Sequence, residues 1–184
     1  FVANSNLTAK LAIADGADPA RVTVRHNGVD TQRYHPERYL DERPGLRARW
    51  GLESAGVAFL LVAHNLRLKN LDLLLRVFAR LPRELHAKLV VAGKRRPGCQ
   101  ASWLVYAGQT DDMAAFYAAA DALVHPTYFD SCANVVLEAM AMKVPVVATD
   151  VGAVTELLGS GEAGIVVPPR DAAALAEAVL AVLT

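Results

Sequence analysis

Residues 122–148 read ALVHPTYFDSCANVVLEAMAMKVPVVA, and this stretch decides the fold class. A run of apolar residues over Ala122–His125 is followed by a helical pattern over Ala133–Met142 and by a second apolar run over Pro145–Ala148. Strands that are apolar on consecutive residues are typical of a parallel sheet with both faces covered. The stretch therefore predicts two parallel strands joined by a right-handed helical crossover.

The same alternation extends in both directions along the chain. The other predicted strands are Val22–Arg25, Phe59–Ala63, Lys88–Ala92, Trp103–Ala107 and Ile165–Val167. The other predicted helices are Leu7–Ala14 capped by Ser5, Leu46–Trp50, Leu71–Leu81, Met113–Ala120 capped by Thr110 or Asp111, Val154–Leu158 and Ala172–Leu183. This pattern predicts an α/β fold, a doubly wound, Rossmann-like parallel sheet, in one domain over residues 1–184.

One predicted connection is unusually short. Only ten residues, Gly93 to Ser102, separate the strand Lys88–Ala92 from the strand Trp103–Ala107, and they include Pro97 and Gly98. A parallel crossover usually needs about a dozen residues and a helix. Either the connection is exceptionally tight or a segment has been lost from it, and we expect the second.

Composition excludes several classes of protein. An apolar content of 53% excludes disorder, and the balance of 19 basic and 19 acidic residues gives nucleic-acid binding no support from bulk charge. Cys99 and Cys132 form no metal-binding motif, which favours a reduced, cytoplasmic protein. No apolar run reaches the ~18 residues that a membrane span needs. Because the chain starts at Phe1 and ends within a helical pattern, we expect a fragment of a longer protein.

A basic loop follows the predicted strand Phe59–Ala63. Arg67 and Lys69 lie beside the start of the next helix, where the helix dipole disfavours cations unless an anion is shared. Free helix N–H groups together with an Arg and a Lys can bind a diphosphate. The alternative is a solvated basic loop, and the loop alone does not decide between the two.

Two acids flank the start of the predicted helix Ala133–Met142. Glu138 lies among apolar residues, where a carboxylate is costly unless it is paired or faces a ligand. It could accept both hydroxyls of a ribose. Asp130 could accept hydroxyls of a sugar ring, while the N–H groups of Ala133, Asn134 and Val135 meet phosphate. The alternative is a core glutamate and a capping aspartate.

These segments resemble the C-terminal domain of retaining GT-B glycosyltransferases of glycosyltransferase family 4, and most of all lipopolysaccharide-core glucosyltransferases of the WaaG type. The segments that carry the resemblance are Asn4-Ser5, His26–Asp30 with Pro36, Asn65–Asn70, Asp130–Glu138 with the spacing of the family's E-x7-E motif, and Glu138–Ala141 followed by Pro145–Gly152. The sequence departs from the family pattern at Asp130 for the first Glu, and at Ala133, Lys143 and Ala153 for glycines. The resemblance therefore leaves the donor sugar open.

The resemblance implies transfer of a hexose from a nucleotide-sugar, with a UDP-sugar as the expected donor, with retention and without a metal or other cofactor. Lys69 and Arg67 would offset charge on the leaving diphosphate, Glu138 would hold the ribose, Asp130 the sugar, and Gly108 and Gln109 the base. The acceptor, a glycan or lipid-linked molecule such as lipopolysaccharide core, would be bound by a separate N-terminal domain. The resemblance also implies a cytoplasmic enzyme whose full-length form can associate peripherally with the inner membrane.

Two other functions remain open at this point. A nucleotide-sugar 2-epimerase would share the fold but would need acid–base groups, for which His64 and His125 are the candidates. A non-catalytic nucleotide-binding or regulatory α/β module is the third alternative. As a phospho-receiver it would use Asp121, which has no acidic cluster around it in the sequence.

Overall fold

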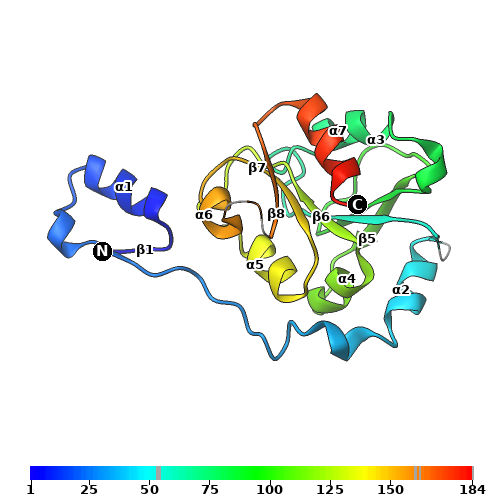
Figure 1. The fold of residues 1–184 in the computed structure, drawn as a ribbon, viewed down its shortest axis with the longest axis horizontal. Helices are drawn as coiled ribbons and strands as arrows, with labels where there is room; N and C mark the ends of the chain where they lie inside the picture. Colours follow the sequence, from blue (N-terminus) through cyan, green and yellow to red (C-terminus); the bar gives the residue numbers. More distant parts are fainter. Residues whose placement is uncertain (53–54, 160, 162, 184) are drawn as a thin grey trace.

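The protein is built around a parallel sheet of six strands (Figure 1). The computed structural model describes residues 1–52, 55–159, 161 and 163–183. The strands are β3 (Ala58–Val62), β4 (Lys88–Ala92), β5 (Leu104–Gly108), β6 (Ala122–His125), β7 (Val146–Thr149) and β8 (Gly164–Val167). Their order is β5-β4-β3-β6-β7-β8, so the chain winds outward from β3 in both directions. The predicted doubly wound fold is confirmed.

Helices cover both faces of the sheet. One face carries α2 (Arg43–Arg49), α4 (Met113–Ala119), α5 (Asn134–Ala141) and α6 (Val154–Leu158); the other carries α3 (Leu71–Phe78) and α7 (Ala172–Ala181). Strand residues alternate between the two cores. Leu60 and Leu123 pack toward the first face, and Phe59 and Val124 toward the second, all fully buried. Burial on both faces explains why these strands read as continuous apolar runs.

Most predicted helices are confirmed with shifted ends. α3 ends at Phe78 rather than Leu81, and α2 begins at Arg43, three residues early, because Pro44 fits the first turn of a helix. Ser5 caps the first helix as predicted. The cap predicted for α4 was wrong. Asp112, which directly precedes the helix, accepts from the Ala115 amide at 3.4 Å.

The connection between β4 and β5 runs without a helix. The two strands pair in parallel, and the residues present span the gap as a loop, which shows that the tight connection is geometrically possible. The Tyr106 hydroxyl donates to the Gly93 carbonyl at 2.9 Å and so ties the loop to β5. Every residue of β5 is only half buried. Loss of a segment here stays a prediction.

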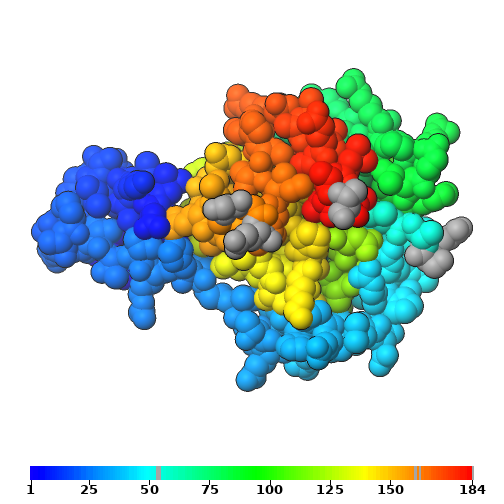
Figure 2. Space-filling view, viewed as in Figure 1, coloured from blue at the N-terminus to red at the C-terminus, as the bar shows by residue number. Residues whose placement is uncertain are grey.

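Residues 1–24 form a small lobe that stands apart from the sheet (Figures 1 and 2). It contains β1 (Val2–Ala3), α1 (Asn6–Ala14), the short 3-10 helix η1 (Pro19–Arg21) and β2 (Thr23–Val24). The predicted strand over Val22–Arg25 exists as β2, but it pairs with β1 in a separate two-stranded sheet and does not join the main one. A long linker follows β2 and leads past η2 (Pro36–Tyr39) to α2.

The lobe is fastened to the main body through α6. The Glu156 carboxylate accepts from the backbone amide and the side-chain amide of Asn6, at 3.0 and 2.7 Å, and contacts the ring of His26. These contacts join segments that lie far apart in the sequence. Within the described residues, no helix is long and apolar enough to cross a membrane.

Candidate functional site

The sheet changes winding direction between β3 and β6, and ligands of open α/β sheets bind in the crevice beyond the strand ends at such a point. The loops that follow these two strands meet there. The Tyr128 amide donates to the Leu68 carbonyl at 3.0 Å, and the Thr127 hydroxyl reaches the same carbonyl at 3.2 Å. The Thr149 hydroxyl, at the end of β7, donates to the Thr127 carbonyl at 2.8 Å. Three strand ends are thereby joined into one surface.

Lys69 and Asp130 form an ion pair at the centre of this surface. The Lys69 ammonium lies 2.7 Å from Oδ2 of Asp130, and Lys69 is only 5% exposed. Burial raises the pKa of the Asp130 carboxyl, but the neighbouring His125 ring and Lys69 ammonium outweigh the effect of burial and bring this pKa down to about 2. Asp130 is therefore ionised at neutral pH. The two residues were predicted to bind separate parts of the donor, and the structure pairs them with each other.

His125 ends β6 directly beside this ion pair. Its Nε2 lies 3.4 Å from Oδ2 of Asp130, and its side chain is fully buried. Burial lowers the pKa of His125, so the ring is neutral at pH 7. A completely enclosed ring cannot serve as an acid or base on a substrate, and His64 is exposed in the loop after β3. The acid–base pair that a 2-epimerase would need is not assembled.

The remaining phosphate-binding candidates surround the ion pair. Arg67 is exposed on the rim, in the same loop as Lys69. Ala133 takes the N-cap position of α5, and no side chain in the described part of the chain caps this helix. Asn134 is exposed and accepts from the Asn27 side chain at 2.6 Å, so the linker from the N-terminal lobe borders the site. Uncapped amides at Asn134 and Val135 fit an anion.

Glu138 has a protein partner that the sequence did not indicate. The buried Tyr117 hydroxyl on α4 donates to its Oε2 at 2.9 Å, and Glu138 is itself only half buried. A second tyrosine, Tyr34, also lies close to Glu138. Burial, and then the negative charge of Glu138, raise the pKa of the Tyr34 hydroxyl to about 12. Glu138 is thus paired within the protein, by a residue of another helix, and its predicted contact with a ribose stays a prediction. Glu138 therefore faces two tyrosines, Tyr117 and Tyr34, and its Oε1 takes no part in the bond to Tyr117.

The predicted base-binding residues lie farther out. Gly108 and Gln109 follow β5, the edge strand, which β4 separates from β3. Gly108 has a positive φ of 78° and its carbonyl accepts from the Gly93 amide at 2.8 Å. Gly108 and Gln109 lie at the same carboxyl edge of the sheet as Lys69 and Asp130. No hydrogen bond among the described residues joins the two pairs.

Gly152 supports the site in a way that sequence reasoning missed. It has a φ of 61°, and a Cβ placed on it would lie 1.5 Å from the Asp130 carbonyl oxygen. The loop after β7 therefore packs backbone against backbone on the loop that carries Asp130. The resemblance to a glycine-containing family loop pointed to this position but not to its contact.

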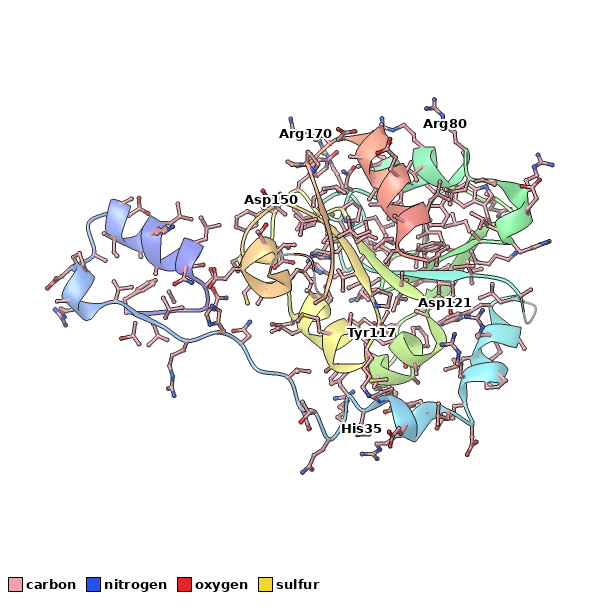
Figure 3. The ribbon with its side chains drawn as sticks, in the orientation of Figure 1. His35, Arg80, Tyr117, Asp121, Asp150 and Arg170 are labelled. Atoms are coloured by element: carbon pink, nitrogen blue, oxygen red, sulfur yellow. The ribbon has the colours of Figure 1, made fainter. Side chains whose placement is uncertain are left out.

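Asp121 lies at the opposite edge of the sheet from Asp150 (Figure 3). Its carboxylate accepts from Arg43 at 2.6 Å, from Arg47 at 2.8 Å and from the Ala58 amide at 2.7 Å. These contacts tie α2 to the amino ends of β3 and β6, which is a structural role. The phospho-receiver alternative loses its candidate aspartate. Among the described residues there is also no cluster of three His, Cys, Asp or Glu side chains suited to a metal ion.

Comparison with known proteins agrees with this geometry. A family model described as "Glycosyl transferases group 1" matches residues 57–184. The D-inositol 3-phosphate glycosyltransferase of Streptomyces bingchenggensis is 32% identical to this chain, and the match covers 86% of this chain and 39% of that protein. The D-inositol 3-phosphate glycosyltransferase of Nocardioides sp. is 33% identical, and the match covers 93% of this chain and 43% of that protein. The chain belongs to the group 1 glycosyl transferases.

Solved structures agree on the fold. HepE of Anabaena in complex with UDP superposes with a TM-score of 0.87 at 22% identity, over 98% of this chain and 52% of that one. WaaG, a glycosyltransferase involved in lipopolysaccharide biosynthesis, superposes with a TM-score of 0.84 at 24% sequence identity. The superposition covers 99% of this chain and 53% of the WaaG chain. The fold is thus the C-terminal half of the GT-B type. The chain spans about two fifths of the curated relatives it matches.

The curated relatives also bear on the short β4–β5 connection. The match to the Nocardioides protein runs over 200 positions yet takes in 93% of this 184-residue chain. The relative therefore has residues, inside the matched region, that this chain lacks. A helical crossover between β4 and β5 is one place where they would fit.

Proposed function

We propose that this chain is the donor-binding domain of a retaining glycosyltransferase that transfers a hexose from a UDP-sugar. The observation that carries the proposal is the buried Lys69–Asp130 pair at the switch point between β3 and β6, next to the uncapped start of α5. A lysine held there by a single carboxylate can turn to a diphosphate. Support also comes from the solved structure of HepE in complex with UDP and glucose.

Each site residue would bind the part of the nucleotide-sugar that its position in the site can reach. Lys69, Arg67 and the amides of Asn134 and Val135 would stabilise charge on the leaving diphosphate, so that no metal or other cofactor is needed. Glu138 would accept from the ribose hydroxyls beside its bond to Tyr117, since each carboxylate oxygen can accept more than one donor. Asp130 would orient the sugar, and Gly108 with Gln109 would border the base. Retention at the anomeric carbon rests on the family resemblance.

Two acceptors are compatible with this proposal. A glycan or lipid-linked acceptor such as lipopolysaccharide core is supported by the structural likeness to WaaG. A phosphorylated inositol is supported by the curated relatives, whose names specify it. Either acceptor would bind between this domain and a second one. The most exposed large apolar side chains of the small lobe, Phe1, Val2 and Leu11, suit contact with such a domain, and peripheral membrane association of the whole enzyme remains part of the proposal.

Changing Glu138 to Gln is expected to weaken UDP binding about ten- to a hundredfold, about 1.4–2.7 kcal/mol. The amide keeps an oxygen for the Tyr117 hydroxyl but loses the charge that ribose hydroxyls would meet. Ligand-free stability should change by less than about 0.5 kcal/mol. Thermal melts with and without UDP measure both effects.

The matched control is Glu177→Gln, an exposed glutamate on α7, which should change neither melt. A lower ligand-free melting temperature of the Glu138 variant, combined with an unaltered UDP-induced shift, would show instead that Glu138 is a core residue.

The 184-residue chain is expected to bind UDP and UDP-glucose but to transfer sugar poorly, because the acceptor-binding half is not part of it. Calorimetry with UDP, GDP and ADP, followed by a transfer assay with UDP-glucose, tests this directly. Tighter binding of GDP or ADP would change the proposed donor. Rapid transfer to an acceptor by this chain alone would refute the division of labour between two domains.

A further inference from the structure

His125 is a fully buried histidine that the proposed transfer chemistry leaves without a role. It ends β6, whose other residues are all apolar, and neither of its ring nitrogens makes a regular hydrogen bond to any described residue. An unpartnered polar ring in a core is costly, and an aliphatic side chain would fill the same space without that cost. A purely structural explanation therefore does not account for a histidine at this position.

The ring lies beside a single oxygen that already has another donor. Oδ2 of Asp130 accepts from the Lys69 ammonium at 2.7 Å, while Nε2 of His125 is 3.4 Å away from the same atom. The same oxygen thus faces two donors, and in the ligand-free protein only the Lys69 ammonium makes a hydrogen bond to it. A shift of about 0.5 Å would bring the ring into ordinary hydrogen-bond distance.

We propose that His125 is a positioning residue that takes over the Asp130 carboxylate when Lys69 turns to the diphosphate of the donor. The inference rests on the proposed function. Without a replacement donor, the departure of Lys69 would leave a largely buried carboxylate unpaired. With His125 beside it, Asp130 stays oriented while Lys69 is released, so the ring lowers the cost of binding the ligand.

The charges around the ring make this exchange observable. The charged groups facing His125, among the residues that the structure describes, are Lys69 from the loop after β3 and Asp130 from the loop after β6. Burial and Lys69 lower the pKa of His125, and Asp130 raises it. When the ammonium shares its charge with a diphosphate, one of the lowering influences weakens. UDP binding should therefore raise the pKa of His125, and the protein should take up more protons on binding than a variant without this ring.

The first test is a double-mutant cycle on UDP affinity. His125→Leu should weaken UDP binding about five- to tenfold, since the carboxylate loses its second donor. In the Asp130→Asn background the same change should alter affinity by less than about twofold. A structural role would give equal losses in both backgrounds, and that result, or no loss in either, would overturn the proposal.

The second test uses His125→Gln, whose amide can donate but cannot take up a proton. UDP affinity should stay within about threefold of the unmodified chain, and calorimetry in two buffers of different ionisation enthalpy should show less proton uptake on binding than in the unmodified chain. If the His125→Gln variant takes up as many protons as the unmodified chain, the proposal is overturned. This test does not depend on whether the His125→Leu variant folds. If Lys69→Ala leaves UDP affinity unaltered, the donor site itself is wrong; if only the cycle fails, the role of His125 alone is wrong.

Discussion

Replacing Lys69 by alanine is expected to weaken UDP binding by about 1.5–3 kcal/mol, roughly ten- to 150-fold, the range of a charge-assisted hydrogen bond. The ammonium is buried and held at the switch point by a single carboxylate, so no neighbouring cation among the described residues can replace it at the same place. Arg67 lies on the exposed rim and is not positioned by the same pair. Calorimetry on the folded variant gives the loss.

The same substitution should also lower stability in a pH-dependent way. Asp130 has a pKa of about 2 in the folded chain, below its ordinary value, so it contributes stability above about pH 4 that is lost as the pH falls toward 2. Without the Lys69 ammonium this pKa rises and part of the contribution is lost, about 1 kcal/mol at pH 7, while His125 remains beside the carboxylate. The gap between variant and unmodified chain should narrow on acidification.

The matched control is Lys88→Ala, because the Lys88 ammonium donates to the Ser102 carbonyl at the other edge of the sheet. It should leave UDP affinity unchanged. A Lys69 variant that binds UDP as tightly as the unmodified chain would remove Lys69 from the site.

Gly152→Ala is expected to disturb both folding and ligand binding. The added Cβ would lie 1.5 Å from the Asp130 carbonyl oxygen, so one of the two backbones must move, and the φ of 61° disfavours alanine in addition. We expect a loss of about 3 kcal/mol or more in the free energy of unfolding, and weaker UDP binding in whatever fraction folds. Urea denaturation measures the first effect.

Gly51 provides a control for the backbone strain alone. It has a φ of 66°, and a methyl group placed on its Cα would meet no atom within 4 Å, so Gly51→Ala should cost only about 1 kcal/mol. Equal losses for the two variants would show that the loops after β6 and β7 are not locked together by their backbones.

The sheet was predictable because burial on both faces leaves a direct trace in the sequence. β6, β7 and the helix between them were located within one or two residues, since apolar runs and helical spacing change sharply there. Ends of helices were harder to place, as at Phe78, where apolar residues continue past the last turn. The two-residue strand Val2–Ala3 was not predicted, because it is too short to show a period.

The candidate site was predictable as a set of residue types but not as a set of contacts. Lys69 and Glu138 stood out because each carries a charge where the local pattern disfavours one, and Asp130 because it is an acid in the loop before the helix that carries Glu138. The pairing of Lys69 with Asp130, and of Glu138 with Tyr117, joins residues from separate strands or helices, and a single sequence holds no record of such contacts. The packing of Gly152 on Asp130 is of the same kind.

The central claim is that the carboxyl edge of the sheet, at β3 and β6, binds a nucleotide diphosphate. The most direct measurement is a titration of the isotope-labelled chain with UDP, followed through its backbone amide resonances. The account predicts saturable shifts at residues 65–70 and 130–135, and none at the amino edge around Asp121. Shifts confined to the amino edge, or no saturable shift up to millimolar UDP, would contradict it.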